Sequence, residues 1–207
     1  MLKIPIVRDY YDNEEQLFLY ESLELDKGVT ILVGCNGSGK TTLIHQIQQF
    51  ATKNDIFWFS YDDVVHGRSA AMQIMLEDDI EQLGQLYMSS EGERINRNFS
   101  DRMYKFGKFV KDSGDGKDYI FTIDGYDSGT SIDMIDDLIS FFNMLLEDFK
   151  ERHKNLYIVM STNQYEPCIE NRCLDVTTGD IIEFRNYNDY REFILKSSKF
   201  RDSRYGR

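Results

Sequence analysis

The chain has 207 residues, of which 41% are hydrophobic and 14% aromatic, and its formal net charge is −12. This length and apolar content suit one domain with a packed core and exclude wholesale disorder, and no apolar run approaches the roughly 18 residues of a membrane span. The acidic balance argues against a broad nucleic-acid surface, and three cysteines without a signal-peptide layout at the N-terminus predict a cytoplasmic protein without a disulfide framework.

The first 28 residues are predicted to form an antiparallel hairpin that leads into a central strand. Leu17, Leu19, Leu23 and Leu25 fall on alternate positions, which is the period of a half-buried strand. Residues 26–28 supply the turn before the next strand.

The most specific motif is the segment Gly34–Thr42, which fits the G-x-x-x-x-G-K-[ST] pattern of phosphate-binding loops. An apolar run at 29–33 precedes it and predicts a buried strand, and a helical pattern of apolar residues follows it. Backbone N–H groups of such a loop and the positive end of the helix cradle phosphate. The alternative is a chance glycine-rich turn, but such a turn would not need a buried strand directly before it and a helix directly after it. The predicted nucleotide-binding residues are Asn36, Gly37, Ser38, Gly39, Lys40, Thr41 and Thr42.

Two residues of this loop have predicted chemical roles. Lys40 is expected to reach the β- and γ-phosphate oxygens, through charge-assisted hydrogen bonds worth about 1.5–3 kcal/mol each. The Thr41 hydroxyl is expected to bind Mg²⁺.

A second buried strand is predicted at 56–60, followed by Asp62 and Asp63, which would either approach a magnesium-bound water or begin a solvated loop. Apolar periodicity then predicts one helix over about 69–88 and another from Ile95 to about Val110. Ser, Gly and acidic residues at 89–94 break the pattern between them. A Ser/Gly turn at a helix N-terminus is a second potential anion site.

The strand predicted at 119–124 ends in Asp124, a carboxylate placed to hold Mg²⁺ through water beside Thr41. An amphipathic helix from about Ile135 to Phe149 follows, and a fourth buried strand at 156–160 ends shortly before Asn163.

The C-terminal part is predicted to contain a hairpin at 173–184 and a short helix at 187–195. From Arg185 onwards there are seven basic and three acidic residues, a net charge of +4 that leaves −16 for the rest of the chain. We favour a solvated end for the basic tail at 196–207, and the alternative is a contact for a phosphate backbone or an acidic partner.

These elements predict an α/β fold of the P-loop NTPase kind. It would have a mostly parallel central sheet, an antiparallel N-terminal hairpin and a small helical subdomain at about 64–111. We expect one domain over residues 1–195, followed by the tail.

With these motifs, residues 15–195 resemble an ATP-binding-cassette (ABC) ATPase, nearest to the heads of SMC and RecF-like proteins and to small AAA-family or ABC ATPases of phages and mobile elements. Residues 36–42 are close to the family's own Walker A loop, and residues 89–93 are similar to its signature but degenerate. Residues 128–133 look like the family's D-loop, and Asp124 matches its Walker B aspartate.

The resemblance implies ATP and Mg²⁺ as cofactors and a head-to-tail homodimer. In that arrangement one subunit supplies the phosphate loop and the other its signature turn, here Ser89, Ser90, Gly92 and Glu93, with Ser90 and Gly92 on the γ-phosphate. If the phosphate loop and the signature turn lie far apart within one chain, they cannot contact the same nucleotide. A two-fold related copy of the chain would bring the two anion sites together.

The chain also departs from the family pattern. Gly125 stands where the family usually has a catalytic glutamate, and Asn163 falls at the position of its switch histidine. The expected catalytic residues are Lys40, Asp124, Asp127 and Asn163. Asp127 is the nearest carboxylate that would activate water, and the alternative is that it only caps the D-loop. We therefore expect ATP binding with slow hydrolysis.

The expected function is a slow ATPase switch that acts on DNA or a nuclease-like partner, without a membrane partner. The alternatives are a nucleotide-binding interaction module that does not hydrolyse ATP, the ATPase subunit of a transporter, and a small-molecule kinase. A kinase would leave the D-loop-like and signature-like segments unexplained.

Overall fold

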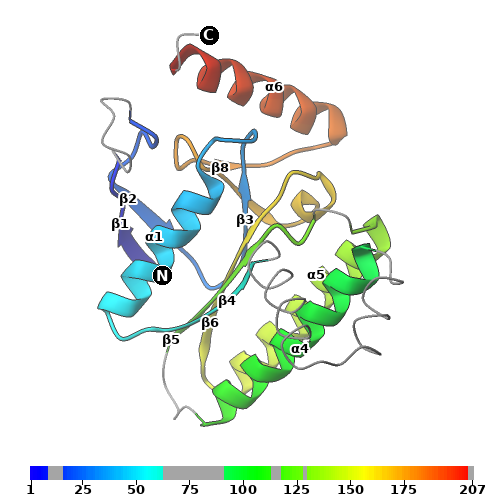
Figure 1. Cartoon of the computed structure of the whole chain (residues 1–207). Helices are drawn as coiled ribbons and strands as arrows, with labels where there is room; N and C mark the ends of the chain where they lie inside the picture. Colours follow the sequence, from blue (N-terminus) through cyan, green and yellow to red (C-terminus); the bar gives the residue numbers. More distant parts are fainter. Residues whose placement is uncertain (9–15, 63–90, 113–117, 128–129, 205–207) are drawn as a thin grey trace, which may run out of the picture.

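The computed structural model describes residues 1–8, 16–62, 91–112, 118–127 and 130–204. They form an α/β molecule with a six-stranded sheet and a separate two-stranded hairpin (Figure 1). In sheet order the six strands are β4 (Phe57–Asp62), β5 (Asp118–Asp124), β6 (Asn155–Ser161), β3 (Gly28–Val33), β7 (Arg172–Asp175) and β8 (Ile181–Ile182).

Five neighbouring strands of the sheet, β4, β5, β6, β3 and β7, run parallel, and β8 pairs antiparallel with β7. The predicted α/β class, mostly parallel sheet and C-terminal hairpin are thereby confirmed. The central strands are nearly continuous apolar runs, as expected for parallel strands that are covered on both faces.

The predicted N-terminal hairpin is present, but its strands are shorter than the leucine alternation suggested. It consists of β1 (Leu2–Pro5) and β2 (Ser22–Leu25). Leu17 and Leu19 lie before β2, where their N–H groups donate to Arg8 O and Thr177 O, both at 2.9 Å. Bonds to two different segments draw this stretch away from the hairpin ladder.

Helices cover both faces of the sheet (Figure 1). One face packs against α4 (Glu91–Asp112) and α5 (Ile132–Glu151), and the other against α1 (Lys40–Lys53) and the hairpin. Successive side chains of β5 therefore point to opposite faces of the sheet. Phe121 lies in the core beneath α4 and α5, and Ile120 lies in the core beside α1. Phe121 and Phe106 stack with ring centroids 5.3 Å apart.

The start of α4 corrects one sequence-based boundary. The helix begins at Glu91, whereas the pattern predicted a beginning near Ile95, so Gly92 and Glu93 lie inside its first turn. The predicted helix at 69–88, Asp63, Ser89, Ser90 and residues 128–129 of the D-loop-like segment lie outside the described residues.

The C-terminal region also differs from the expected length. After a short 3₁₀ turn η1 (Glu166–Cys168) and the β7–β8 hairpin, helix α6 runs over Tyr187–Arg204. It continues well past the predicted end near Leu195, so most of the basic tail is helical. Within the described ranges, none of the helices combines the length and apolar character that crossing a membrane requires.

Candidate functional site

The phosphate loop connects the end of β3 to the start of α1. Gly37 and Gly39 adopt φ values of +77° and +106°, in the left-handed region that favours glycine. An ideal Cβ on Gly39 would lie 3.0 Å from side-chain atoms of Leu17, so the loop is also closely packed. A backbone that turns in this way directs successive N–H groups to one side and forms an anion-binding concavity. Lys40 begins α1, whose positive end adds to it.

A cavity of about 370 Å³ lies at the carboxyl ends of the parallel strands, where α/β sheets usually bind ligands. The loop residues, the end of β5 and the segment after β6 form its wall. Its lining residues are Leu17, Asn36, Gly37, Gly39, Lys40, Thr41, Thr42, Asp124, Gly125, Ser161 and Asn163.

The cavity therefore brings together most of the residues predicted from three separate motifs. Among the predicted loop residues, Ser38 is the exception, because its side chain is buried. Leu17 and Ser161 were not predicted as site residues. The signal for Ser161 was its place at the end of a buried strand, and Leu17 carried no signal beyond apolar alternation.

Lys40 is buried beside the loop that it would serve. Its Nζ donates to Gly34 O at 2.8 Å and to Cys35 O at 3.3 Å. Burial lowers the pKa of the Lys40 ammonium, and the charges of Asp127, Cys35 and Asp124 oppose that effect. A phosphate in the cavity would offer this partly desolvated cation a stronger partner than the carbonyl groups.

Oxygen donors suited to Mg²⁺ lie on the cavity wall. Thr41 is exposed in the first turn of α1, and Asp124 is half-buried at the end of β5. The Ser161 hydroxyl donates a hydrogen bond to Asp124 Oδ1 and holds that carboxylate at the edge of the sheet. Hydroxyl and carboxylate oxygens are the protein ligands that Mg²⁺ prefers, so this donor set fits the predicted metal.

Asp127 is more deeply placed than its predicted role as a base requires. It is 3% exposed and is not among the residues that line the cavity. Its Oδ2 accepts hydrogen bonds from the Thr162 hydroxyl at 2.8 Å and from Asn163 N–H. The Gln164 side chain donates to the Asp127 carbonyl at 2.7 Å. Asp127 thus holds the segment after β6, which carries Asn163 on the cavity wall.

The two carboxylate oxygens of Asp127 have different surroundings. Oδ1 is buried and has no hydrogen-bond partner within the described part of the chain. The described partners of Asp127 lie at 162–164, so a cap confined to the D-loop does not account for its contacts.

Gly125 has a backbone conformation that explains why a glutamate is not simply interchangeable with it. Its φ is +76°, in the left-handed region, where a glutamate would be strained. A glutamate at this position would therefore carry a backbone strain that glycine avoids.

The signature-like turn is not brought to this cavity within one chain by the part of the structure that is described. Gly92 and Glu93 lie in the first turn of α4, and none of the described lining residues belongs to α4.

No protein-family model matches the chain, and no curated protein sequence matches it. The resemblance to ABC ATPases therefore rests on the sequence motifs and their order along the chain.

Proposed function

We propose that this chain is an ATP-binding, slowly hydrolysing ABC-type ATPase that works as a nucleotide-dependent, head-to-tail homodimer. The observation that carries the proposal is the convergence of Lys40, Thr41, Asp124 and Asn163 on one cavity at the carboxyl edge of the sheet. These residues come from three segments that are far apart in sequence, and each was predicted from its own motif.

Binding of ATP exchanges partners at Lys40. Its ammonium would exchange the carbonyl groups of Gly34 and Cys35 for phosphate oxygens, and the loop N–H groups would donate hydrogen bonds to other phosphate oxygens. Thr41 and Asp124 would hold Mg²⁺, which would supply positive charge to stabilise the negative charge of the phosphates.

We expect slow ATP hydrolysis because the carboxylates near the cavity are poorly available to act as a general base. Gly125 supplies none, and Asp127 already accepts hydrogen bonds from Thr162 and Asn163. A general base typically contributes about 10²–10⁴-fold to a rate. Among the described lining residues the only carboxylate is that of Asp124, which we assign to Mg²⁺. Asn163 can orient a water or a phosphate oxygen through its neutral amide.

In the proposed homodimer, the turn at 89–93 would act on the nucleotide of a two-fold related copy. The described lining residues of the cavity include none from α4, which is compatible with that arrangement. ATP then joins the two chains, and hydrolysis removes the link. DNA or a nuclease-like protein is the partner class we propose for the switch, with exposed Arg191 and Lys196 of α6 as candidate contacts.

A nucleotide-binding module without turnover is the second candidate. The left-handed conformation of Gly125 favours it, because a glutamate at this position would be strained while glycine is not.

The experiment compares the wild-type chain with Lys40→Ala, with folding of both checked by circular dichroism. We expect calorimetry to show ATP binding in the presence of Mg²⁺ that the variant loses, and phosphate release that is slow but exceeds the variant's. If the wild type binds ATP but releases phosphate no faster than Lys40→Ala does, the non-hydrolysing module is the better description. Equal ATP binding by both proteins, or by neither, would overturn the nucleotide-binding proposal itself.

A further inference from the structure

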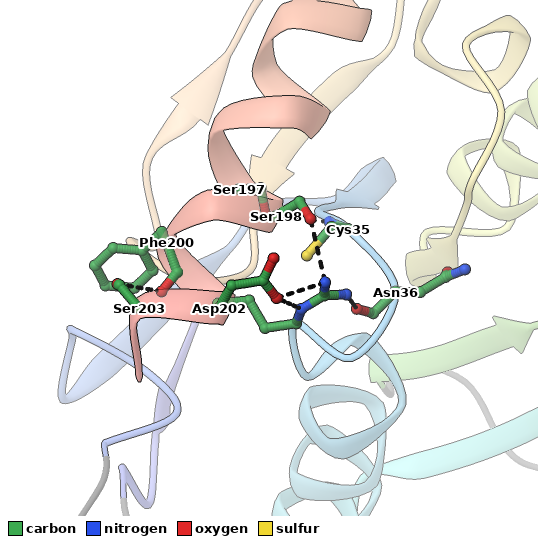
Figure 2. Close-up of polar contacts among 8 residues, drawn as sticks. Cys35, Asn36, Ser197, Ser198, Phe200, Asp202 and Ser203 are labelled. Atoms are coloured by element: carbon green, nitrogen blue, oxygen red, sulfur yellow. Dashed lines mark hydrogen bonds and ion pairs between the residues drawn. The ribbon is translucent and has the colours of Figure 1, made fainter. Parts of the chain in front are cut away.

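The C-terminal half of α6 lies against the phosphate loop, although some 160 residues separate them in sequence (Figure 2). Ser197 Oγ accepts a hydrogen bond from Cys35 N–H at 3.1 Å. Arg201 donates from Nη1 to Asn36 O at 2.6 Å. One end of the helix therefore bonds to two successive residues of the loop, one through its N–H group and the other through its carbonyl group.

Arg201 is itself held in place for this contact. Its Nη2 donates to Ser198 Oγ at 3.2 Å, and Nε and Nη2 donate to Asp202 Oδ1 at 2.9 and 2.7 Å. Its Cδ lies 3.5 Å from the ideal Cβ position of Gly37, so the side chain packs directly on the loop. A long side chain that is already ordered loses less entropy when it makes a further contact.

A third contact extends along the cavity mouth. Arg204 Nη1 donates to Leu17 O at 2.9 Å and to Gln16 O at 3.2 Å. Leu17 lines the cavity and packs beside the Gly39 position. The same helix thus touches both the phosphate loop and the segment that faces it.

These contacts do not use the groups that an anion would need. They engage Cys35 and Asn36, at the beginning of the loop, whereas the N–H groups at the start of α1 belong to later residues. The helix and a bound phosphate can therefore hold the loop at the same time, and each favours the loop conformation that the other requires.

We propose that α6 is an intramolecular clasp that preorganises the phosphate loop, with Ser197 and Arg201 as positioning residues for nucleotide binding. The inference rests on the proposed function, since it concerns the same cavity. The loop contains several glycines and would lose much backbone freedom on binding, so a clasp that orders it beforehand raises affinity.

The test uses the full chain with Arg201→Ala and Ser197→Ala, and with Lys199→Ala and Ser203→Ala as controls. The two controls are exposed residues of the same helix, and neither has a described contact with the loop. We expect the dissociation constant for ATP to rise roughly three- to tenfold in Arg201→Ala, somewhat less in Ser197→Ala, and to stay unchanged in the controls. Arg201→Lys should recover part of the loss.

A second readout needs no nucleotide. Amide hydrogen exchange of residues 34–39 in the nucleotide-free protein should be faster in both test variants than in the controls. Ser197→Ala removes a single hydroxyl, so it keeps the test available if Arg201→Ala does not fold.

The outcomes separate this inference from the proposed function. If the wild type binds ATP while both test variants bind it equally well, the clasp is overturned and the proposed function stands. If neither the wild type nor any variant binds ATP, the proposed function fails, and the exchange rates alone decide whether α6 orders the loop. Unchanged exchange in both variants would overturn the clasp in either case.

Discussion

The carboxylate of Asp127 has a buried position and two hydrogen-bond donors on the segment that carries Asn163. We predict that it positions this segment and does not abstract a proton from water. Asp127→Asn would keep the shape and weaken both bonds, and we expect ATP turnover to fall about tenfold with little change in ATP affinity.

The size of this effect distinguishes two roles. Loss of a general base would lower turnover by about 10²–10⁴-fold, so a drop of that size would contradict the positioning role. Asp136→Asn, at an exposed position of α5, is the charge-matched control. Steady-state kinetics of the three proteins, with affinity measured separately, make the comparison.

Lys40 should make nucleotide binding dependent on pH. Burial lowers its pKa in the free protein, and bound phosphate would raise it again. The bound-state pKa is then the higher one, so affinity is complete below the free-state pKa and falls as pH rises through it, because binding there requires proton uptake.

Calorimetry in two buffers of different ionisation enthalpy measures that uptake. We expect it to be larger at about pH 9.5 than at about pH 7 in the wild type, and to be absent in Lys40→Arg, whose guanidinium stays protonated. The same uptake in Lys40→Arg would assign the proton to a group other than Lys40.

At the scale of elements, Gly39 of the phosphate loop and Gly107 of α4 should respond in opposite ways to an added methyl group. Gly39 has φ +106°, and an ideal Cβ there would lie only 3.0 Å from Leu17 side-chain atoms, whereas an ideal Cβ on Gly107 of α4 meets nothing within 4 Å. We expect Gly39→Ala to lower the free energy of unfolding by about 1–3 kcal/mol and Gly107→Ala to raise it by about 0.5–1 kcal/mol. Urea unfolding of both variants tests this, and equal effects would contradict the left-handed requirement at the loop.

At the scale of the whole molecule, the proposed switch predicts a change in mass. A chain of 24.4 kDa should be monomeric with ADP and should form a dimer with ATP and Mg²⁺, because the γ-phosphate would be held from both sides. Light scattering measures this directly, with Lys40→Ala as the control that should remain monomeric. The same mass with either nucleotide would contradict the head-to-tail arrangement.

Local patterns in the sequence determined the buried strands, the phosphate loop and the place of Asp124. A parallel strand covered on both faces reads as an apolar run such as 119–123, and the loop needs glycines and a lysine at set spacings. Each signal lies within a few neighbouring residues, so it needs no knowledge of the rest of the chain. Boundaries were less certain: α4 and α6 extend beyond the apolar periodicity that predicted them, since polar residues also continue a helix.

Only the tertiary structure decided which distant residues meet. It placed β6 between the strand of the phosphate loop and the strand of Asp124, joined Ser161 to Asp124 and Asp127 to Asn163, and laid the end of α6 on the loop. Partners such as Cys35 and Ser197 are 162 residues apart, and each one alone is an ordinary polar or apolar position. Their contact depends on how the sheet orders its strands and on how α6 packs, and neither is encoded in the spacing of residues along one element.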